Sequence, residues 1–280
     1  MPELPEAETI VRGLRRAIVG QRVARVEVVH ADVLRVAPRR LRAEAVGRTI
    51  EGVARRGKNV LALLDGHRVL AVNLGMTGRL LPFSAAPRGA ERPTHPAVRL
   101  RFEGGGVLVF DDQRRFGTFE VLDAEAWAQR DARMGPEPLE PGFTAARLAR
   151  DLRASRSPVR SWLLDQRRIA GVGNIYALEA LHGAGIHPLR PADRITEVEA
   201  AWLYAAIREV LRAAIRRGGT TIRDYRNAEG GEGAYAAHLR VYGREGAPCL
   251  SCGDPVERVV LSNRSAYFCP TCQPADASTP

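Results

Sequence analysis

Residues 249–272 read CLSCGDPVERVVLSNRSAYFCPTC and contain all four cysteines of the chain. The cysteines form two CxxC pairs, Cys249 with Cys252 and Cys269 with Cys272, with strand-like runs between them. Two such pairs at this spacing offer four thiolates to one tetrahedral zinc ion, so this stretch predicts a zinc ribbon. Disulfide bonds are the alternative, which a reducing cellular compartment would disfavour. A zinc ribbon is usually structural, although its hairpin can carry basic residues to nucleic acid.

The bulk composition is that of a globular protein with a preference for polyanions. With 280 residues, 45% hydrophobic and 26% charged, the chain is long enough for about two domains with cores of their own. The formal net charge of +10 and the pI of about 10.3 favour a polyanionic partner, with a merely basic, soluble surface as the alternative. No apolar run approaches the ~20 residues of a membrane span, and the first residues are too charged for a signal peptide. We therefore expect a soluble, cytoplasmic protein without a membrane partner.

Two kinds of periodicity divide the chain. Residues 6–19 predict an amphipathic helix that ends at Gly20, and β-rich runs follow it over 22–30, 48–56, 60–66, 68–75, 97–103 and 106–112. These runs predict a β-sandwich or barrel. A segment rich in proline and glycine, 134–143, predicts a linker, and helices are expected beyond it over 144–153, 158–166, 174–183 and Glu197–Arg217.

The longest expected helix carries its own start and stop signals. Thr196 suits the N-cap, Glu199 completes a capping box and Gly218 suits the C-terminal stop. The chain as a whole is therefore expected to be an α+β protein, in which a β-sandwich with flanking helices precedes a helical part and the ribbon.

The N-terminal stretch MPELPEAETI places a proline second, with glutamates close behind it. A helix start alone explains this pattern, because Pro5 and carboxylates such as Glu8 suit the first turn. Removal of Met1 would instead leave the secondary amine of Pro2 at the terminus. An α-amino group titrates near ~7.8, against ~10.4 for lysine, and is therefore a ready nucleophile for an aldehyde at neutral pH.

One basic residue differs from all the others. Of the 42 lysines and arginines, only Lys58, in the stretch ARRGKNV, is a lysine. Because arginine stands at every other basic position, a lone lysine indicates a site that needs a compact ammonium group or a group that can exchange a proton. The alternative is that Lys58 is a lysine by chance and has no special role.

Several motifs of the chain recur together in one order: PELPEAET (2–9), RRGK (55–58), LGMTGRL (74–80), DDQRRFG (111–117), DQRRIAGVGNIYALEAL (165–181), GGTTIRDY (218–225), VYGREGAPC (241–249) and the four cysteines. In order and spacing, from Pro2 to about Gln273, they resemble the bacterial formamidopyrimidine-DNA glycosylases of the Fpg/Nei family. Three positions depart from the family pattern. Asn73 stands where histidine is frequent, Gln113 where proline is common and Arg160 where lysine is frequent, which bears on details of phosphate contact.

The resemblance implies a catalytic β-sandwich domain (1–133), a linker (134–143), a helix-two-turns-helix DNA-binding domain (144–237), the zinc ribbon (238–273) and a disordered tail (274–280). It implies a bifunctional DNA glycosylase and AP lyase of base excision repair. Such an enzyme removes 8-oxoguanine and formamidopyrimidines from duplex DNA and nicks the strand at the abasic sugar by β,δ-elimination. One structural Zn²⁺, no organic cofactor and a monomeric state are expected.

The resemblance also assigns the chemistry to particular residues. Pro2 would be the nucleophile at the sugar and form a Schiff base, and Glu3 would be the general acid and base. Glu6 would position or relay protons nearby. Lys58 would stabilise charge at the damaged base or the adjacent phosphate, and Arg264 would hold a phosphate and assist the last elimination.

A second set of residues is implied to bind the DNA. Met76, Arg114 and Phe116 would enter the space of the flipped base, with Phe116 as a wedge and Arg114 bonded to the orphaned cytosine. Phosphate contacts are implied for His95, Arg156, Asn174 and Arg264. The glycine-rich segment 223–235 would close over the flipped base.

Three other functions remain open at this point. An endonuclease VIII-like glycosylase would remove oxidised pyrimidines instead. A non-catalytic zinc-ribbon DNA-binding protein would explain the charge and the cysteines but not Pro2 and Glu3. A small-molecule enzyme of the tautomerase kind would explain an N-terminal proline but not the ribbon or the charge.

Overall fold

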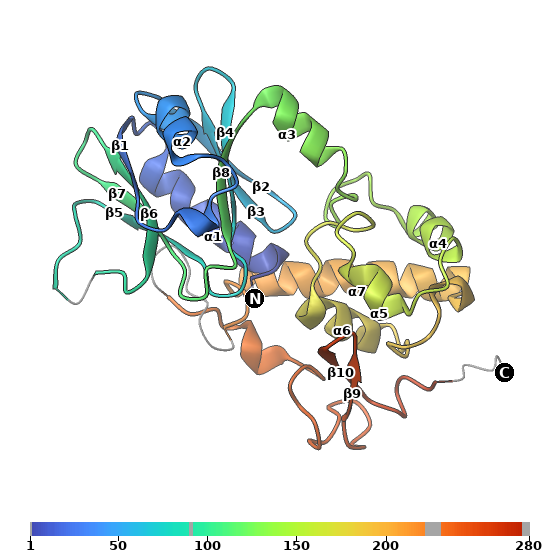
Figure 1. Ribbon diagram of the computed structural model, residues 1–280. Helices are drawn as coiled ribbons and strands as arrows, with labels where there is room; N and C mark the ends of the chain where they lie inside the picture. The colour runs from blue at the N-terminus through green and yellow to red at the C-terminus, as the bar shows by residue number, and fades with distance from the viewer. Residues whose placement is uncertain (1, 90–91, 222–230, 276–280) are drawn as a thin grey trace. The chain divides into compact units, whose positions relative to one another are not determined.

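The computed structural model describes residues 2–89, 92–221 and 231–275 (Figure 1). The chain forms two compact units. Unit 1 comprises Met1–Arg133 and Ile215–Ala236, and unit 2 comprises Met134–Ala214 and Ala237–Pro280. Nowhere along the described residues does a helix combine the length and the apolar character needed to cross a membrane.

Unit 1 is built on two four-stranded antiparallel sheets. One sheet has the order β1-β6-β7-β5 and the other the order β2-β3-β4-β8. The strands are β1 (Val23–Val28), β2 (Ile50–Arg56), β3 (Asn59–Leu64), β4 (Arg68–Asn73), β5 (Arg79–Phe83), β6 (Pro96–Phe102), β7 (Val107–Asp111) and β8 (Thr118–Asp123). The helices of this unit are α1 (Leu4–Ile18), α2 (Pro38–Ala45) and α3 (Ala124–Asp131), with a short 3-10 turn, η1 (Ala31–Val33). The predicted β-sandwich is confirmed.

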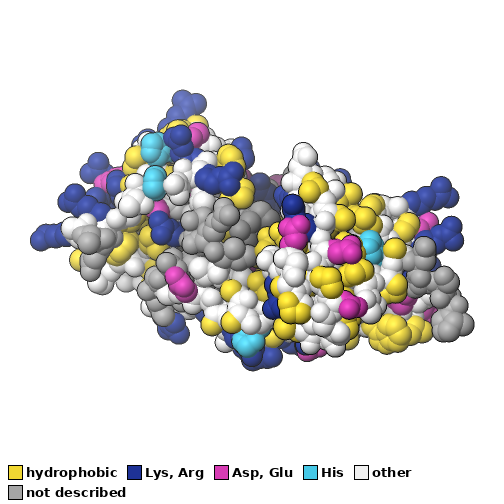
Figure 2. Space-filling view, turned by 90° about the horizontal axis from the view of Figure 1, so that it is seen from below, with side chains coloured by type: hydrophobic (Ala, Val, Ile, Leu, Met, Phe, Trp, Pro, Cys, Tyr) yellow, Lys and Arg dark blue, Asp and Glu magenta, His cyan; other side chains and the backbone are white. Residues whose placement is uncertain are grey.

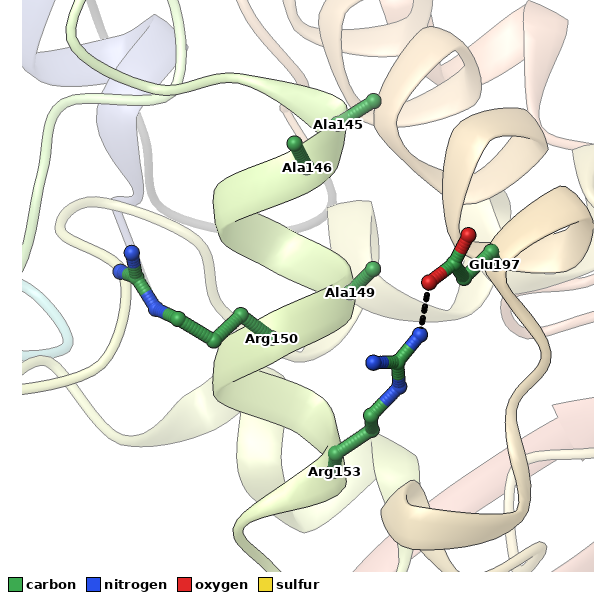
Figure 3. A pocket seen from close by; sticks show the side chains of 6 residues that line it. All are labelled: Ala145, Ala146, Ala149, Arg150, Arg153 and Glu197. Atoms are coloured by element: carbon green, nitrogen blue, oxygen red, sulfur yellow. Dashed lines mark hydrogen bonds and ion pairs between the residues drawn. The ribbon is translucent and has the colours of Figure 1, made fainter.

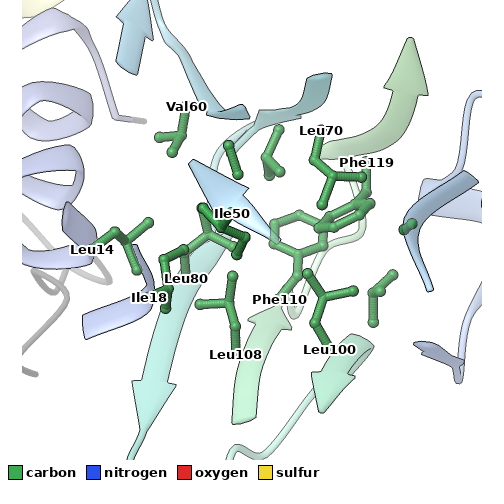
Figure 4. Packing of buried hydrophobic residues seen from close by; sticks show 14 of the residues in the cluster. Leu14, Ile18, Ile50, Val60, Leu70, Leu80, Leu100, Leu108, Phe110 and Phe119 are labelled. Atoms are coloured by element: carbon green, nitrogen blue, oxygen red, sulfur yellow. The ribbon is translucent and has the colours of Figure 1, made fainter. Parts of the chain in front are cut away.

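Apolar side chains from both sheets and from α1 share one core. Leu100, Leu108 and Phe110 come from one sheet, and Val60, Leu70 and Phe119 come from the other, as Figure 4 shows. The Phe110 and Phe119 rings lie 6.0 Å apart between centroids. Leu14 and Ile18 bring one face of α1 into the same cluster, so burial of this apolar surface fixes the helix against the sheets.

Four elements of unit 1 are absent from the sequence predictions, and each has a weak local signal. β5 contains Pro82 and lies at the edge of its sheet, where a residue without an N–H is tolerated. β8 directly follows the loop DDQRRFG, which obscures its alternation. The helices α2 and α3 are rich in charged residues and bury little, with only Leu41 and Ala45 buried in α2 and none in α3.

Unit 2 contains the predicted helices. They are α4 (Ala145–Arg153), α5 (Val159–Leu164), α6 (Asn174–Gly183), the 3-10 turn η3 (Ala192–Arg194) and α7 (Glu197–Arg216), whose last two residues group with unit 1. The predicted capping box of α7 is confirmed, because the Glu199 carboxylate accepts the Thr196 N–H at 2.8 Å and the Thr196 hydroxyl accepts the Glu199 N–H at 3.2 Å. Gly218, just beyond the helix, has a φ of 72°.

The ribbon forms the C-terminal part of unit 2. After the short turn η4 (Tyr235–His238), strands β9 (Glu257–Leu261) and β10 (Arg264–Phe268) pair antiparallel through a two-residue turn. Ser262 and Asn263 have φ values of 50° and 59°, the left-handed conformation that such a tight hairpin requires. The ribbon packs on α6 through a small cluster that includes Leu178, Val241 and Ala266.

Candidate active site

The N-terminal residues are held in a buried cluster. Pro2 is buried, and Glu3 and Glu6 are each 1% exposed. The Glu6 carboxylate accepts the Glu3 N–H at 2.7 Å and, from a distant part of unit 1, the Thr220 N–H at 2.7 Å. The structure therefore brings Pro2, Glu3 and Glu6 together at the start of α1.

A glycine from a distant part of the chain makes this cluster possible. Gly219 has a φ of +86°, and a Cβ atom there would lie 2.8 Å from Oε1 of Glu6. Only glycine combines this backbone conformation with such close approach. The paired glycines of the motif GGTTIRDY indicate an unusual backbone conformation. Nothing in the neighbouring sequence shows that this backbone contacts Glu6, near the other end of the chain.

Lys58 lies in the tight turn between β2 and β3. Gly57 precedes it with a φ of 56°, and Lys58 itself is half-buried. Arg55 fixes this turn to α1, because its guanidinium donates to the Gly57 carbonyl at 3.0 Å and to the Glu8 carboxylate at 3.2 Å. Glu8, expected only to suit the helix start, therefore also supports the lysine turn.

The three residues predicted to fill the space of a flipped base lie on two adjacent loops. Met76 is 41% exposed and Phe116 is 58% exposed, although both are large apolar side chains. The Arg114 guanidinium lies over the Phe116 ring, 4.7 Å from its centroid. The structure thus brings Met76, Arg114 and Phe116 into one exposed group, which we call the wedge.

The buried Asp112 carboxylate holds the wedge together. One oxygen accepts the Thr77 hydroxyl at 2.5 Å, and the other accepts the Gly117 N–H at 2.8 Å. Thr77 in turn accepts the Arg114 N–H at 3.0 Å. Each loop is therefore tied to the other through hydrogen bonds, so the exposed wedge has a rigid base.

Close backbone contact adds to these hydrogen bonds. A Cβ atom on Gly75, which has a φ of +58°, would lie 2.5 Å from the Gly117 nitrogen. Asn73 reaches across to the lysine turn, since its amide donates to Asn59 Oδ1 at 3.1 Å and its own oxygen accepts the Gly75 N–H at 3.0 Å. The Asn73 amide thus connects the wedge loop to the strand that follows Lys58.

His95 is positioned by the neighbouring aspartate. The fully buried Asp111 carboxylate accepts the His95 N–H at 2.6 Å and a guanidinium N–H of Arg79 at 2.5 Å. The Asp112 N–H donates to the His95 carbonyl at 3.0 Å. The adjacent pair Asp111 and Asp112 thus supports both His95 and the wedge, which sequence reasoning missed because buried aspartates have no local signal.

In unit 2, Asn174 and the ribbon hairpin are joined by a buried arginine. Arg160 is 2% exposed and donates two hydrogen bonds to Asn174 Oδ1, at 2.9 and 2.7 Å. The Asn174 amide donates to the Ser265 carbonyl at 3.0 Å, and Arg160 donates to the Leu261 carbonyl at 3.2 Å. Burial, and then the positive charge of Arg264, lower the pKa of Arg160. The planar fork of arginine suits this two-bond contact.

The remaining predicted DNA contacts of unit 2 lie on its surface. Arg264 is exposed at the start of β10, next to the carbonyls that Arg160 and Asn174 bind. The Arg156 side chain is 96% exposed, and its nearest acidic partner, Asp193, lies 3.8 Å away. The structure thus brings Asn174 and Arg264 to one region and leaves Arg156 projecting from the surface. Most of the predicted closing segment 223–235 lies outside the described residues.

The four cysteines converge as a zinc site requires. Their sulfur atoms all lie within 4.8 Å of one another, with 3.9 Å between Cys249 and Cys272 and 3.4 Å between Cys252 and Cys269. Tetrahedral zinc with Zn–S bonds of ~2.3 Å places its sulfurs about 3.8 Å apart. Burial and the neighbouring thiols raise the pKa of Cys272, because a further thiolate is unfavourable there without a cation. The residues therefore fit one structural zinc ion.

Charged side chains are spread widely over the surface, and unit 2 also contains a cavity away from the predicted site residues. Figure 2 shows Lys and Arg side chains scattered over the face that it draws, with acidic ones among them. The cavity, of about 300 Å³, is lined by alanines of α4 and by Arg150, Arg153 and Glu197 (Figure 3). Arg153 forms an ion pair with Glu197, and none of the predicted site residues lines the cavity.

Three family descriptions match successive parts of the chain. Residues 1–119 match the formamidopyrimidine-DNA glycosylase N-terminal domain, residues 134–226 match the formamidopyrimidine-DNA glycosylase H2TH domain, and residues 246–275 match the zinc finger found in FPG and IleRS. Together these matches cover most of the chain.

Similar proteins extend over the whole length. A formamidopyrimidine-DNA glycosylase of Chloroflexus aggregans is 45% identical over 276 residues, 98% of each chain, and one of Dinoroseobacter shibae is 42% identical over 283 residues, 98% of this chain and all of its own. The crystal structure of MutM (Fpg) from Thermus thermophilus matches with a TM-score of 0.88 and 43% identity, covering 98% of this chain and 100% of that one. A complex of a Lactococcus lactis Fpg mutant with DNA containing Fapy-dG matches with a TM-score of 0.90 and 33% identity over the same shares. The chain therefore belongs to the formamidopyrimidine-DNA glycosylase family.

Proposed function

We propose that this protein is a DNA glycosylase of base excision repair that removes oxidised purines from duplex DNA and then cuts the strand as an AP lyase. The observation that carries the proposal is the buried cluster of Pro2, Glu3 and Glu6, because an N-terminal proline with a carboxylate beside it is a nucleophile with its proton donor. The Fapy-dG and abasic-site complexes of similar proteins support this substrate class.

The first step replaces the bond to the base by a bond to the protein. After removal of Met1, the Pro2 nitrogen attacks C1′ while the glycosidic bond breaks, and the base leaves with the bonding pair and takes up a proton in exchange for the one that the Pro2 N–H gives up. Glu3 gives a proton to the ring oxygen, so the sugar opens and an iminium ion links Pro2 to C1′. Glu6 orients Glu3 through the backbone contact at 2.7 Å.

The second step uses the charge of that adduct. The Pro2 nitrogen already carries two carbon substituents, so the iminium is positively charged at any pH. This charge acidifies the C2′ hydrogen, whose loss expels the 3′ phosphate, and a later proton loss from C4′ expels the 5′ phosphate. Water then releases Pro2 by hydrolysis of the iminium. Lys58 stabilises the charge that develops on the departing base, and Arg264 assists the last elimination at a phosphate.

The wedge residues would fill the space that the extruded base leaves in the duplex. Unstacking a base costs a few kcal/mol, which contacts in the vacated space offset. Phe116 enters between bases, Met76 fills volume and Arg114 hydrogen-bonds the orphaned base. The hydrogen bonds of Asp112 and Thr77 support this assignment, since they hold the exposed side chains ready before DNA binds.

Unit 2 and its ribbon hold the backbone of the DNA. Asn174 and the first amides of α6 contact one phosphate, Arg264 contacts another, and His95 and Arg156 contribute weaker contacts. The four cysteines would hold the zinc ion, which would keep the hairpin of Arg264 in place and supply no chemistry to the reaction. We further propose that the protein acts as a monomer in the cytoplasm.

A cleavage assay on two matched duplexes tests the function. One duplex carries 8-oxoguanine opposite cytosine, and the other carries an oxidised pyrimidine in the same sequence. Preferred excision and nicking of the first duplex is expected. Preference for the second would support an endonuclease VIII-like specificity, and tight binding without cleavage of either would support a non-catalytic DNA-binding protein.

A further inference from the structure

A histidine lies beside one of the zinc-binding cysteines without belonging to the cysteine cluster. His182, in the last turn of α6, is 5% exposed, and its Nε2 atom lies 3.6 Å from the sulfur of Cys249. Cys249 itself is buried, at 4% exposed. The contact is therefore a hydrogen bond in a place that water does not reach, where it is stronger than at the surface.

The chemistry of a bound zinc ion fixes the direction of this hydrogen bond. A zinc-bound cysteine is a thiolate and carries no proton, so the proton between the two atoms must be on Nε2. The other ring nitrogen, Nδ1, is buried and has no hydrogen-bond partner among the described residues. A proton on Nδ1 would be unsatisfied there, which favours the tautomer that donates from Nε2 to Cys249.

His182 is one of three residues of α6 that contact the ribbon or the segment before it. The first residue of this helix, Asn174, bonds the ribbon hairpin at Ser265, and Glu179 in its middle accepts the backbone N–H groups of residues 240–242 at 2.8 to 3.0 Å. His182 adds a third contact, directly to a metal ligand. One helix thus holds the hairpin, the segment before the ribbon and the zinc site.

We infer that His182 is a positioning residue of the zinc site, whose Nε2–H donates to the Cys249 thiolate and so increases the retention of the metal. The inference rests on the proposed structural zinc. A donor aimed at a thiolate withdraws charge from the sulfur and fixes its direction, and loss of such partners commonly lowers metal affinity by about 10–100-fold. Nothing in the proposed reaction uses His182.

The test compares His182 variants by their zinc affinity and by the absorption spectrum of the cobalt-substituted protein. The variant His182→Phe keeps a flat ring of similar size but has no donor, and His182→Gln restores an N–H. We expect His182→Phe to raise the Kd for zinc, measured by competition with a chromogenic chelator, by roughly tenfold. In the cobalt-substituted protein the thiolate-to-metal charge-transfer band should move to lower energy, because the sulfur lone pair loses its donor. His182→Gln should recover part of both effects.

His187 provides the matched control. It is also a buried histidine of unit 2, and its ring packs edge-on against Phe268 with centroids 4.4 Å apart, but its described contacts include no cysteine. His187→Phe should leave the charge-transfer band in place. Equal effects of His182→Phe and His187→Phe would reduce the role of His182 to packing and overturn the inference.

Two further outcomes separate the inference from the zinc assignment. If the parent protein holds one zinc per chain and His182→Phe changes neither the Kd nor the spectrum, the inference is wrong and the zinc site stands. If the purified parent protein binds no zinc with four-thiolate character, the zinc assignment itself fails and the inference fails with it.

Discussion

The wedge of unit 1 and the ribbon hairpin of unit 2, the two regions that we propose contact DNA, are held in place in different ways. The wedge loops lie on a large sandwich core and are held by a buried carboxylate and by contacts between glycine backbones. The ribbon has a small core in which Cys249 and Cys269 are buried and against which Cys272 packs, so we expect its shape to depend on the proposed zinc ion. In the proposed complex, the residues that face the base are therefore held by the fold itself, whereas the hairpin that carries Arg264 depends on the zinc ion as well as on its hydrogen bond with Asn174.

This difference predicts that catalysis and DNA binding fail separately. A change near Pro2 should stop the chemistry and leave the affinity for DNA, whereas loss of zinc should lower the affinity for any duplex. Each of the substitutions below tests that separation.

The largest effect is expected for Glu3→Gln. The amide keeps the shape of the buried side chain but cannot donate the proton that opens the sugar, so 8-oxoguanine excision should fall by about 10²–10⁴-fold. Single-turnover excision and binding to an uncleavable abasic analogue are measured on the same preparation. An equal loss of affinity and rate would show that Glu3 supports the structure and is not the proton donor.

Loss of the metal should have the next largest effect. Cys249→Ser or Cys272→Ser removes a ligand, so zinc is released and Arg264 loses its support, with binding about thirtyfold weaker, or ~2 kcal/mol. The loss should be the same for damaged and undamaged duplexes, because phosphate contacts carry no sequence information. Unchanged affinity for abasic DNA would show that the ribbon serves stability only.

Lys58→Arg tests the lone lysine. The larger planar guanidinium should not fit beside Pro2 and an extruded purine, and it cannot release its proton near neutral pH. Excision of 8-oxoguanine should fall by roughly tenfold, equivalent to about 1.4 kcal/mol, while cleavage at a preformed abasic site should suffer less. An unchanged rate would make Lys58 an accident of composition, and an equal fall on both substrates would assign it to the sugar or phosphate.

Thr77→Val should have the smallest effect. It removes the hydroxyl that joins Asp112 to the Arg114 backbone and leaves the core untouched, so we expect a loss of roughly threefold to tenfold in excision opposite cytosine. Thr49→Val is a matched control, since the Thr49 hydroxyl also lies beside a carboxylate, that of Asp65. Equal effects of the two changes would contradict a specific role of Thr77 in the wedge.

The sequence predicts features with local signals and misses those that depend on distant contacts. The capping residues Thr196 and Glu199 locate the start of α7, and the cysteine spacing predicts the metal cluster. In contrast, the hydrogen bond from Thr220 to Glu6 joins residues more than two hundred positions apart, and Asp112 acts through loops that only the folded sandwich brings together. Elements with a weak local signal, such as the edge strand β5 with its proline, are also missed.

Borohydride trapping on abasic DNA tests directly whether the N-terminal amine of Pro2 is the nucleophile. Borohydride reduces the imine or iminium that the sugar forms with an amine of the protein, and this chain offers only the terminus and Lys58 as amines. We predict that Lys58→Arg, in which the terminus is the only remaining amine, still forms the covalent adduct, with the sugar attached to Pro2. A chain retaining Met1 should form no adduct at Pro2. Loss of trapping in Lys58→Arg, with the parent adduct mapped to Lys58, would contradict the role of Pro2.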